Sequence, residues 1–200
     1  MLWRKVLATS RAPISIVAGA NQQTDPGDTI TITTPVGSAS GDLLISIVAN
    51  NEARTWTTGS GFTEVKDTNG VEVSRQALSG APSANYTFTA SGGVKKSGVM
   101  IALRRGTYGL IGAADTSGAI SAPSINMAKG GILLAVVVNY STGHTFTAPT
   151  GMTAVSGAAV TSGVASIAVF SEEVAAGATG NRAFAEAADY GILIGIYGAN

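Results

Sequence analysis

The sequence predicts an all-β protein, folded as an antiparallel, jelly-roll-like β-sandwich with a weak internal two-fold repeat. Two observations support this fold class. Glycine provides 26 of the 200 residues, which disfavours long helices and suits tight turns. Short alternating or continuously apolar segments recur along the chain, separated by Gly, Ser, Thr, Asn or Pro, and no segment has the pattern of a long helix.

The expected strands form two series. The first covers residues 14–18, 29–34, 43–50, 62–67, 71–78, 86–90 and 99–104, and the second covers residues 132–140, 152–155, 165–172, 182–187 and 192–197.

Three segments carry specific expectations. Residues 43–48 and 132–138 are almost continuously apolar, as is typical of central strands buried on both faces. Residues 29–33 alternate strictly, which places Ile30 and Ile32 on a buried face and the threonines toward solvent or a partner. The dipeptide at 69–70, Asn-Gly, predicts a hairpin between the strands at 62–67 and 71–78.

Four blocks of the first series match four blocks of the second in the same order: 41–50 with 130–139, 61–65 with 151–155, 85–88 with 181–184, and 98–103 with 191–196. Any two strand-rich, glycine-rich stretches could align in this way, but a repeat explains the order better. A half of this size has few apolar residues for a core of its own. We therefore expect one sandwich over residues 25–200, built from half-repeats at about 25–110 and 118–200, after an N-terminal arm and lead-in strand at 1–24. Two domains divided near 112–118 are the alternative.

The composition limits the possible partners. Charged residues make up only 12% of the chain and the formal net charge is +0, so the surface favours association into a homo-oligomer and disfavours nucleic acid. The absence of cysteine excludes disulfides and thiolate sites. The apolar run at 132–138 is far shorter than the ~20 residues of a membrane helix, and Arg11 and Pro13 interrupt any signal peptide. We expect a soluble protein without a membrane partner.

The sequence offers little for catalysis, and we predict no enzyme activity and no cofactor. His144 is the only histidine and no G-x-S-x-G motif is present, so His144 is expected in a loop or partly buried. Glu172 and Glu173 are adjacent on one expected strand, so their side chains point to opposite faces. Residues 25–28, Asp-Pro-Gly-Asp, are best explained as a turn, which leaves a surface Ca²⁺ site open. The basic pairs at 95–96 and 104–105 are expected to be solvated or to contact other subunits.

Two groups of residues are candidate contacts. Trp56 stands in a polar loop and is the aromatic residue expected to be exposed, where it could stack on a glycan. The N-terminal segment combines apolar and basic side chains suited to an attachment arm, with partner contacts at Leu2, Trp3, Arg4, Lys5 and Arg11. The alternative for this segment is a first strand that caps the edge of the sandwich.

Five motifs give the chain a resemblance to phage and prophage virion β-sandwich proteins. They are G-D-L-L-I at 41–45, an aromatic loop around Trp56, G-F-T at 61–63, the A-P-S-A-N-Y-T-F-T strand at 81–89 and the G-V-M-I-A-L-R-R-G strand at 98–106. The resemblance spans roughly residues 29–200 and implies a virion protein that decorates a capsid or forms a head fibre or tail appendage, in contact with other virion proteins. A carbohydrate-binding module of a tail fibre or adhesin is the alternative, and a glycan depolymerase is the third candidate.

Overall fold

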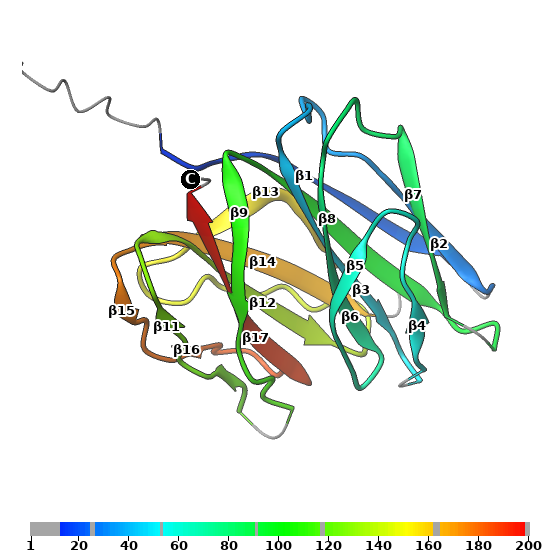
Figure 1. The fold of residues 1–200 in the computed structure, drawn as a ribbon. Helices are drawn as coiled ribbons and strands as arrows, with labels where there is room; N and C mark the ends of the chain where they lie inside the picture. Colours follow the sequence, from blue (N-terminus) through cyan, green and yellow to red (C-terminus); the bar gives the residue numbers. More distant parts are fainter. Residues whose placement is uncertain are drawn as a thin grey trace, which may run out of the picture.

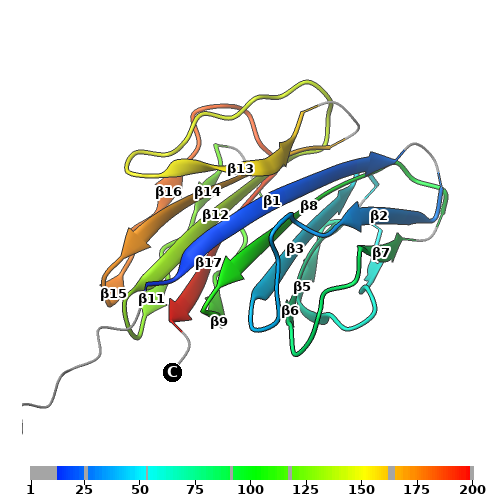
Figure 2. The same cartoon turned by 90° about the horizontal axis from the view of Figure 1, so that it is seen from above.

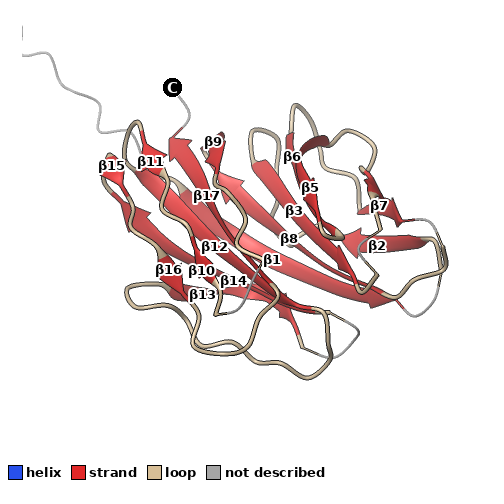
Figure 3. Ribbon diagram, turned by 90° about the horizontal axis from the view of Figure 1, so that it is seen from below, coloured by secondary structure: helices blue, strands red, loops and turns tan. Residues whose placement is uncertain are grey.

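The computed structural model describes residues 13–24, 27–52, 54–90, 92–116, 119–161 and 165–198. Every regular element in these residues is a β-strand, and every ladder between strands is antiparallel (Figure 3). The predicted all-β, antiparallel class is therefore confirmed.

The first half of the chain forms a five-stranded sheet (Figure 1). Its strand order is β1 (Ser15–Thr24), β8 (Lys96–Arg104), β3 (Leu43–Asn50), β6 (Val71–Ala77) and β5 (Thr63–Thr68). The turn between β5 and β6 has positive φ angles of 52° at Asn69 and 75° at Gly70, as a two-residue hairpin turn of this kind requires. The predicted Asn-Gly hairpin is confirmed.

The second half forms another five-stranded sheet, in the order β13 (Thr153–Val160), β14 (Ser166–Val174), β12 (Gly131–Asn139), β17 (Tyr190–Gly198) and β9 (Gly106–Ile111). The chain passes from the first sheet to the second at Arg105, the one residue between β8 and β9. This point precedes residues 112–118, where the two-domain alternative would place a boundary. The strand expected as a lead-in, β1, is a full member of the first sheet.

Shorter strands cover the outer face of each sheet. The first sheet is covered by a three-stranded sheet in the order β2 (Thr29–Thr33), β7 (Asn85–Ala90) and β4 (Trp56–Thr57). Ile30 and Ile32 are buried beneath it while the threonines of β2 are exposed, as predicted. The second sheet is covered by two short ladders, β10 (Ser121–Ala122) with β16 (Arg182–Ala183) and β11 (Asn126–Met127) with β15 (Gly177–Ala178).

Three apolar layers result. Side chains from the facing sides of the two five-stranded sheets form one central cluster, to which Ile45 and Leu134 both belong. The opposite side of β3, with Leu44 and Val48, packs beneath the three-stranded cover, and the opposite side of β12, with Leu133, packs beneath the two short ladders. β3 and β12 are buried along almost their whole length, which confirms that their continuous apolar runs mark central strands.

The two sheets meet along one side, where β1 runs next to β13 (Figure 2). Asn21 Nδ2 donates a hydrogen bond to the carbonyl of Gly157 over 3.1 Å. A Cβ atom on Gly19 would lie 2.6 Å from the backbone nitrogen of Ala158. The two backbones therefore pack directly against each other, and this approach requires glycine in β1.

Candidate functional site

The described chain enters and leaves the sheets at one end. Ile14 leads into β1, and a Cβ atom on Gly198, the last residue of β17, would lie 3.9 Å from Ile14 Cγ1. The start of β1 therefore lies beside the end of β17 (Figures 1 and 2). The predicted partner contacts Leu2, Trp3, Arg4, Lys5 and Arg11 all lie outside the described residues. The segment that contains them is joined to the described chain at Pro13.

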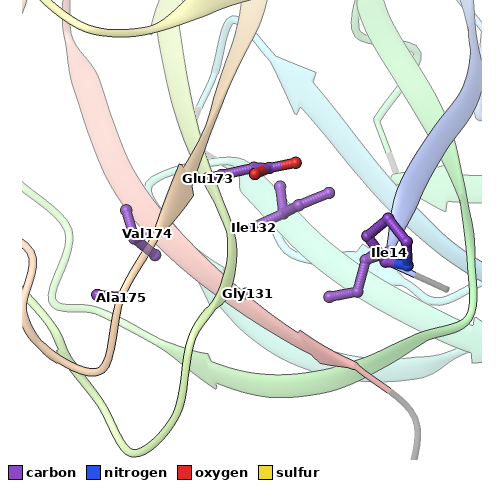
Figure 4. Close-up of a pocket in the computed structure, with 7 residues that line it drawn as sticks. Ile14, Gly131, Ile132, Glu173, Val174 and Ala175 are labelled. Carbon is purple, nitrogen blue, oxygen red and sulfur yellow. The ribbon is translucent and has the colours of Figure 1, made fainter. Parts of the chain in front are cut away.

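A groove lies here between the start of β1 and the neighbouring ends of β12 and β14 (Figure 4). It consists of two adjoining cavities of about 330 and 280 Å³ that share Ile14, Ile132 and Glu173. The remaining lining residues are mostly small or aliphatic: Pro13, Gly131, Val174 and Ala175 in the larger cavity, and Ser15, Ile16, Thr153, Ser171 and Glu172 in the smaller one.

Glu173 is the charged residue that lines both cavities of this groove. It pairs across the ladder with Ile132, whose side chain belongs to the central cluster, so the carboxylate lies at the open end of the central layer. Within the described residues Glu173 forms no hydrogen bond or ion pair. Glu172 instead pairs with Leu133 and binds Arg182, whose Nε donates to its Oε1 over 2.8 Å. The two carboxylates therefore lie on opposite faces of β14, as predicted from their adjacency, and the groove suits a ligand that combines apolar and basic groups.

One contact resembles part of a catalytic dyad, because Ser141 Oγ lies 3.1 Å from His144 Nε2. The single hydroxyl proton of Ser141, however, is donated to Asn139 Oδ1, which can only accept. The orientation of that amide is fixed, since its Nδ2 donates to the carbonyl of Ala187 over 3.0 Å. Ser141 Oγ must then accept a hydrogen bond from the Nε2–H of His144, so in this arrangement the imidazole cannot act as its base. His144 lies half-buried outside the strands, as predicted.

The turn considered for Ca²⁺ is described only from Gly27 onward, since Asp25 and Pro26 lie outside the described residues. Lys96 donates hydrogen bonds from its Nζ to the carbonyl of Gly27 and, over 2.6 Å, to that of Val94. Lys96 is completely buried, so the expectation of a solvated basic pair was wrong for this residue. Burial lowers the pKa of Lys96, and the charge of Asp28 opposes this effect. The ammonium group already supplies the positive charge next to the turn and would repel Ca²⁺ there.

The prediction that Trp56 is exposed was wrong. Its side chain is only 4% exposed and lies beneath the three-stranded cover. The indole Nε1 donates to the carbonyl of Gly70 over 2.8 Å, and the backbone nitrogen donates to Asp67 Oδ2 over 2.9 Å. Trp56 therefore ties β4 to the β5–β6 hairpin, and its ring offers no free face on which a sugar could stack.

No three His, Cys, Asp or Glu side chains in the described parts of the chain are placed to hold a metal ion. The structure as described also contains no helix long and apolar enough to cross a membrane. No family model matches the chain, and neither a curated protein nor a solved structure shows significant similarity to it.

Proposed function

We propose that the protein is a non-enzymatic structural component of a tailed-phage particle, attached to the capsid or tail by protein–protein contacts. The observation that carries this proposal is the groove beside Ile14. It is lined by Ile14, Ile132 and Val174 together with polar groups, and it holds Glu173, a carboxylate without a partner among the described residues, at the end where the described chain enters and leaves the sheets. A low charge density and zero net charge favour association between proteins.

We further infer that the fold contains two copies of one unit, in keeping with the internal repeat expected from the sequence. When Leu43 is placed on Ile132, the ladder partners of the two central strands also correspond. Leu43 pairs with Leu103 and Ile132 pairs with Ile196, while five residues further on Val48 pairs with Gly98 and Val137 with Gly191. Asn50 and Asn139, which end the two strands, both accept a hydrogen bond at Oδ1 from the backbone nitrogen two residues later.

The strand order within the first half supports a jelly-roll unit. The order β1-β8-β3-β6 in one sheet and β2-β7-β4 in the sheet that covers it matches seven strands of an eight-stranded jelly roll, whereas the remaining strand, β5, pairs with β6 in the first sheet. The second half repeats the order with β9-β17-β12-β14. On this inference the molecule is a pair of jelly-roll units joined through a shared central layer, rather than one sandwich. Jelly rolls are frequent in viral capsid proteins, which supports the proposal by analogy of fold alone.

The N-terminal segment is the proposed attachment arm. Its first twelve residues contain Arg4, Lys5 and Arg11 and no acidic residue, together with Leu2 and Trp3. Because this segment is joined to Pro13, it is attached to the rest of the protein next to the groove. Attachment would then use one end of the molecule and leave the opposite end free.

The proposal is tested in the phage or prophage from which the chain derives. Particles purified by density-gradient centrifugation should contain the protein, and immunogold labelling should place it on the capsid or the tail.

In a strain that lacks the gene, a complementing variant without residues 2–12 should melt like the full protein but fail to enter particles. Glu173→Arg should also reduce incorporation, whereas Glu52→Arg, at an exposed site outside the groove, should not. Absence of the protein from purified particles would refute the assignment.

A further inference from the structure

The outer face of the first sheet holds a group of buried polar side chains with unmatched hydrogen-bonding atoms. Ser46 on β3 lies opposite Ser74 on β6, and Glu72 and Gln76 flank Ser74 on the same face of β6. Ser46, Glu72 and Ser74 are all 0% exposed. Among the described residues, no group hydrogen-bonds to Ser46 Oγ, Ser74 Oγ, Glu72 Oε1 or Gln76 Oε1. Four such atoms in one layer are unusual, because buried polar groups are normally paired.

The second sheet shows that the fold does not require polar residues at three of these four positions, whereas Gln76 corresponds to another polar residue, Glu172. In the register that places Leu43 on Ile132, Ser46 corresponds to Ala135, Glu72 to Ala168 and Ser74 to Phe170. These three counterparts are buried in an apolar cluster beneath their own cover. Equivalent positions are therefore occupied by apolar side chains in the second half and by polar side chains in the first. This difference points to a role for the polar oxygen atoms beyond packing.

The charge in this layer is negative. Glu72 Oε2 accepts a hydrogen bond from Thr58 Oγ1 over 3.2 Å. The charged neighbours that act on Glu72 are Glu64 and Asp67, both on the adjacent strand β5. Lys96, at the end of the same face of β8, donates its hydrogen bonds to backbone carbonyls instead. An ionised carboxylate in an apolar layer requires a compensating positive charge.

We propose that Glu72, Ser46 and Ser74 bind a small monovalent cation, Na⁺, inside the layer between the first sheet and its three-stranded cover. Hard cations prefer carboxylate, hydroxyl and carbonyl oxygens, which are the atoms left without partners here. One carboxylate balances one positive charge, so a monovalent ion leaves the buried site neutral. Two further oxygens are available to the ion. Gln76 Oε1 is two residues from Ser74 on the same face of β6, and Thr58 Oγ1 hydrogen-bonds to Glu72.

The test measures thermal unfolding of the full chain at pH 8 and constant ionic strength while Na⁺ replaces choline. Because a ligand that binds only the folded state stabilises it, Tm should rise by about 3–5 °C for each tenfold increase in Na⁺ above the dissociation constant. Glu72→Gln, which removes the charge but keeps the shape, should abolish this rise. Ser46→Ala should weaken it and should still fold, since alanine occupies the corresponding position 135.

A matched control and a direct measurement complete the experiment. Glu52→Gln removes an exposed carboxylate and should leave the Na⁺ response unchanged. The ²³Na NMR signal should broaden with the wild-type protein and not with Glu72→Gln. Equal melting curves in Na⁺ and choline for the wild-type protein would refute the proposal. A response to Ca²⁺ without a response to Na⁺ would refute the monovalent assignment, and a Na⁺ response that persists in Glu72→Gln would place the ion elsewhere.

Discussion

Replacing Glu72 by glutamine should change how the stability of the protein depends on pH. Desolvation by burial raises the pKa of Glu72 from 4.5 to about 6, and the charges of Glu64 and Asp67 add to this effect. The hydroxyls of Ser74 and Thr58 oppose it, although of the two only Thr58 has the geometry of a hydrogen bond to the carboxylate.

The direction in which stability changes with pH follows from proton binding to Glu72. Between pH 4.5 and 6 the folded state keeps a proton on Glu72 that the unfolded state releases, so this group stabilises the fold fully below pH 4.5. The contribution is lost as the pH rises through about 6. The interval between these two pKa values corresponds to about 2 kcal/mol of unfolding free energy.

Urea unfolding from pH 4 to 8, in Na⁺-free buffer and followed by tryptophan fluorescence, measures this contribution. The wild-type protein should lose about 2 kcal/mol relative to Glu72→Gln as the pH rises. Contributions of carboxylates that do not interact with Glu72 cancel in the difference. One of them is Glu186, whose pKa is lowered by its hydrogen bond with Thr147. Parallel stability curves for the two proteins would show that Glu72 ionises as easily in the folded state as in the unfolded chain.

Three further predictions concern packing. Ile45→Ala and Leu134→Ala should each lower the free energy of unfolding by about 2–5 kcal/mol, because both side chains are 0% exposed in the central cluster. Wild-type stability of both variants in chemical denaturation would contradict this assignment of the core. Gly19→Ala should lower Tm, because its Cβ would lie 2.6 Å from backbone atoms of β13, whereas Gly80→Ala meets nothing within 4 Å and serves as the control. Trp56→Phe should cost about 1 kcal/mol for the lost indole hydrogen bond, and an unchanged urea midpoint would argue against that bond.

The central strands could be predicted from the sequence because their pattern depends on simple physics. A strand covered on both faces needs apolar residues at every position, and residues 43–50 and 131–139 have this pattern. β9 was not predicted. It contains Gly106 and Gly109, which weaken a strand pattern, and Gly109 is needed because a Cβ there would lie 2.6 Å from the ring of Tyr197.

The error at Trp56 has an identifiable cause. Its polar neighbours suggested an exposed loop, but Thr55 and Thr57 are exposed while Trp56 points inward, which is the alternation of a half-buried strand. The buried polar layer was also missed. Because Val71 and Val73 face the central cluster, alternation alone would place Glu72 and Ser74 in solvent. The continuous apolar run of β3 already implied that the outer face of this sheet is covered, and the same cover buries its neighbour β6.

The groove could not be derived from sequence, because it depends on how three distant segments meet. Ile14, Ile132 and Glu173 come from the starts of β1 and β12 and the end of β14. Glu173 was considered only as a possible partner of Glu172 in catalysis. Its position in the groove beside Ile14 and Ile132 follows from the ladder register, which the sequence does not specify.

The passage between sheets at Arg105 has a consequence for chain connectivity. No ladder among the described residues joins a strand before Arg105 to a strand after it, and Ile14 and Gly198 are neighbours at one end of the molecule. The order of the two halves along the polypeptide is therefore not needed for any strand pairing. A circularly permuted chain that starts at Gly106, continues through a short linker to Ile14 and ends at Arg104 would contain the same ladders and would exchange the positions of the old and new termini.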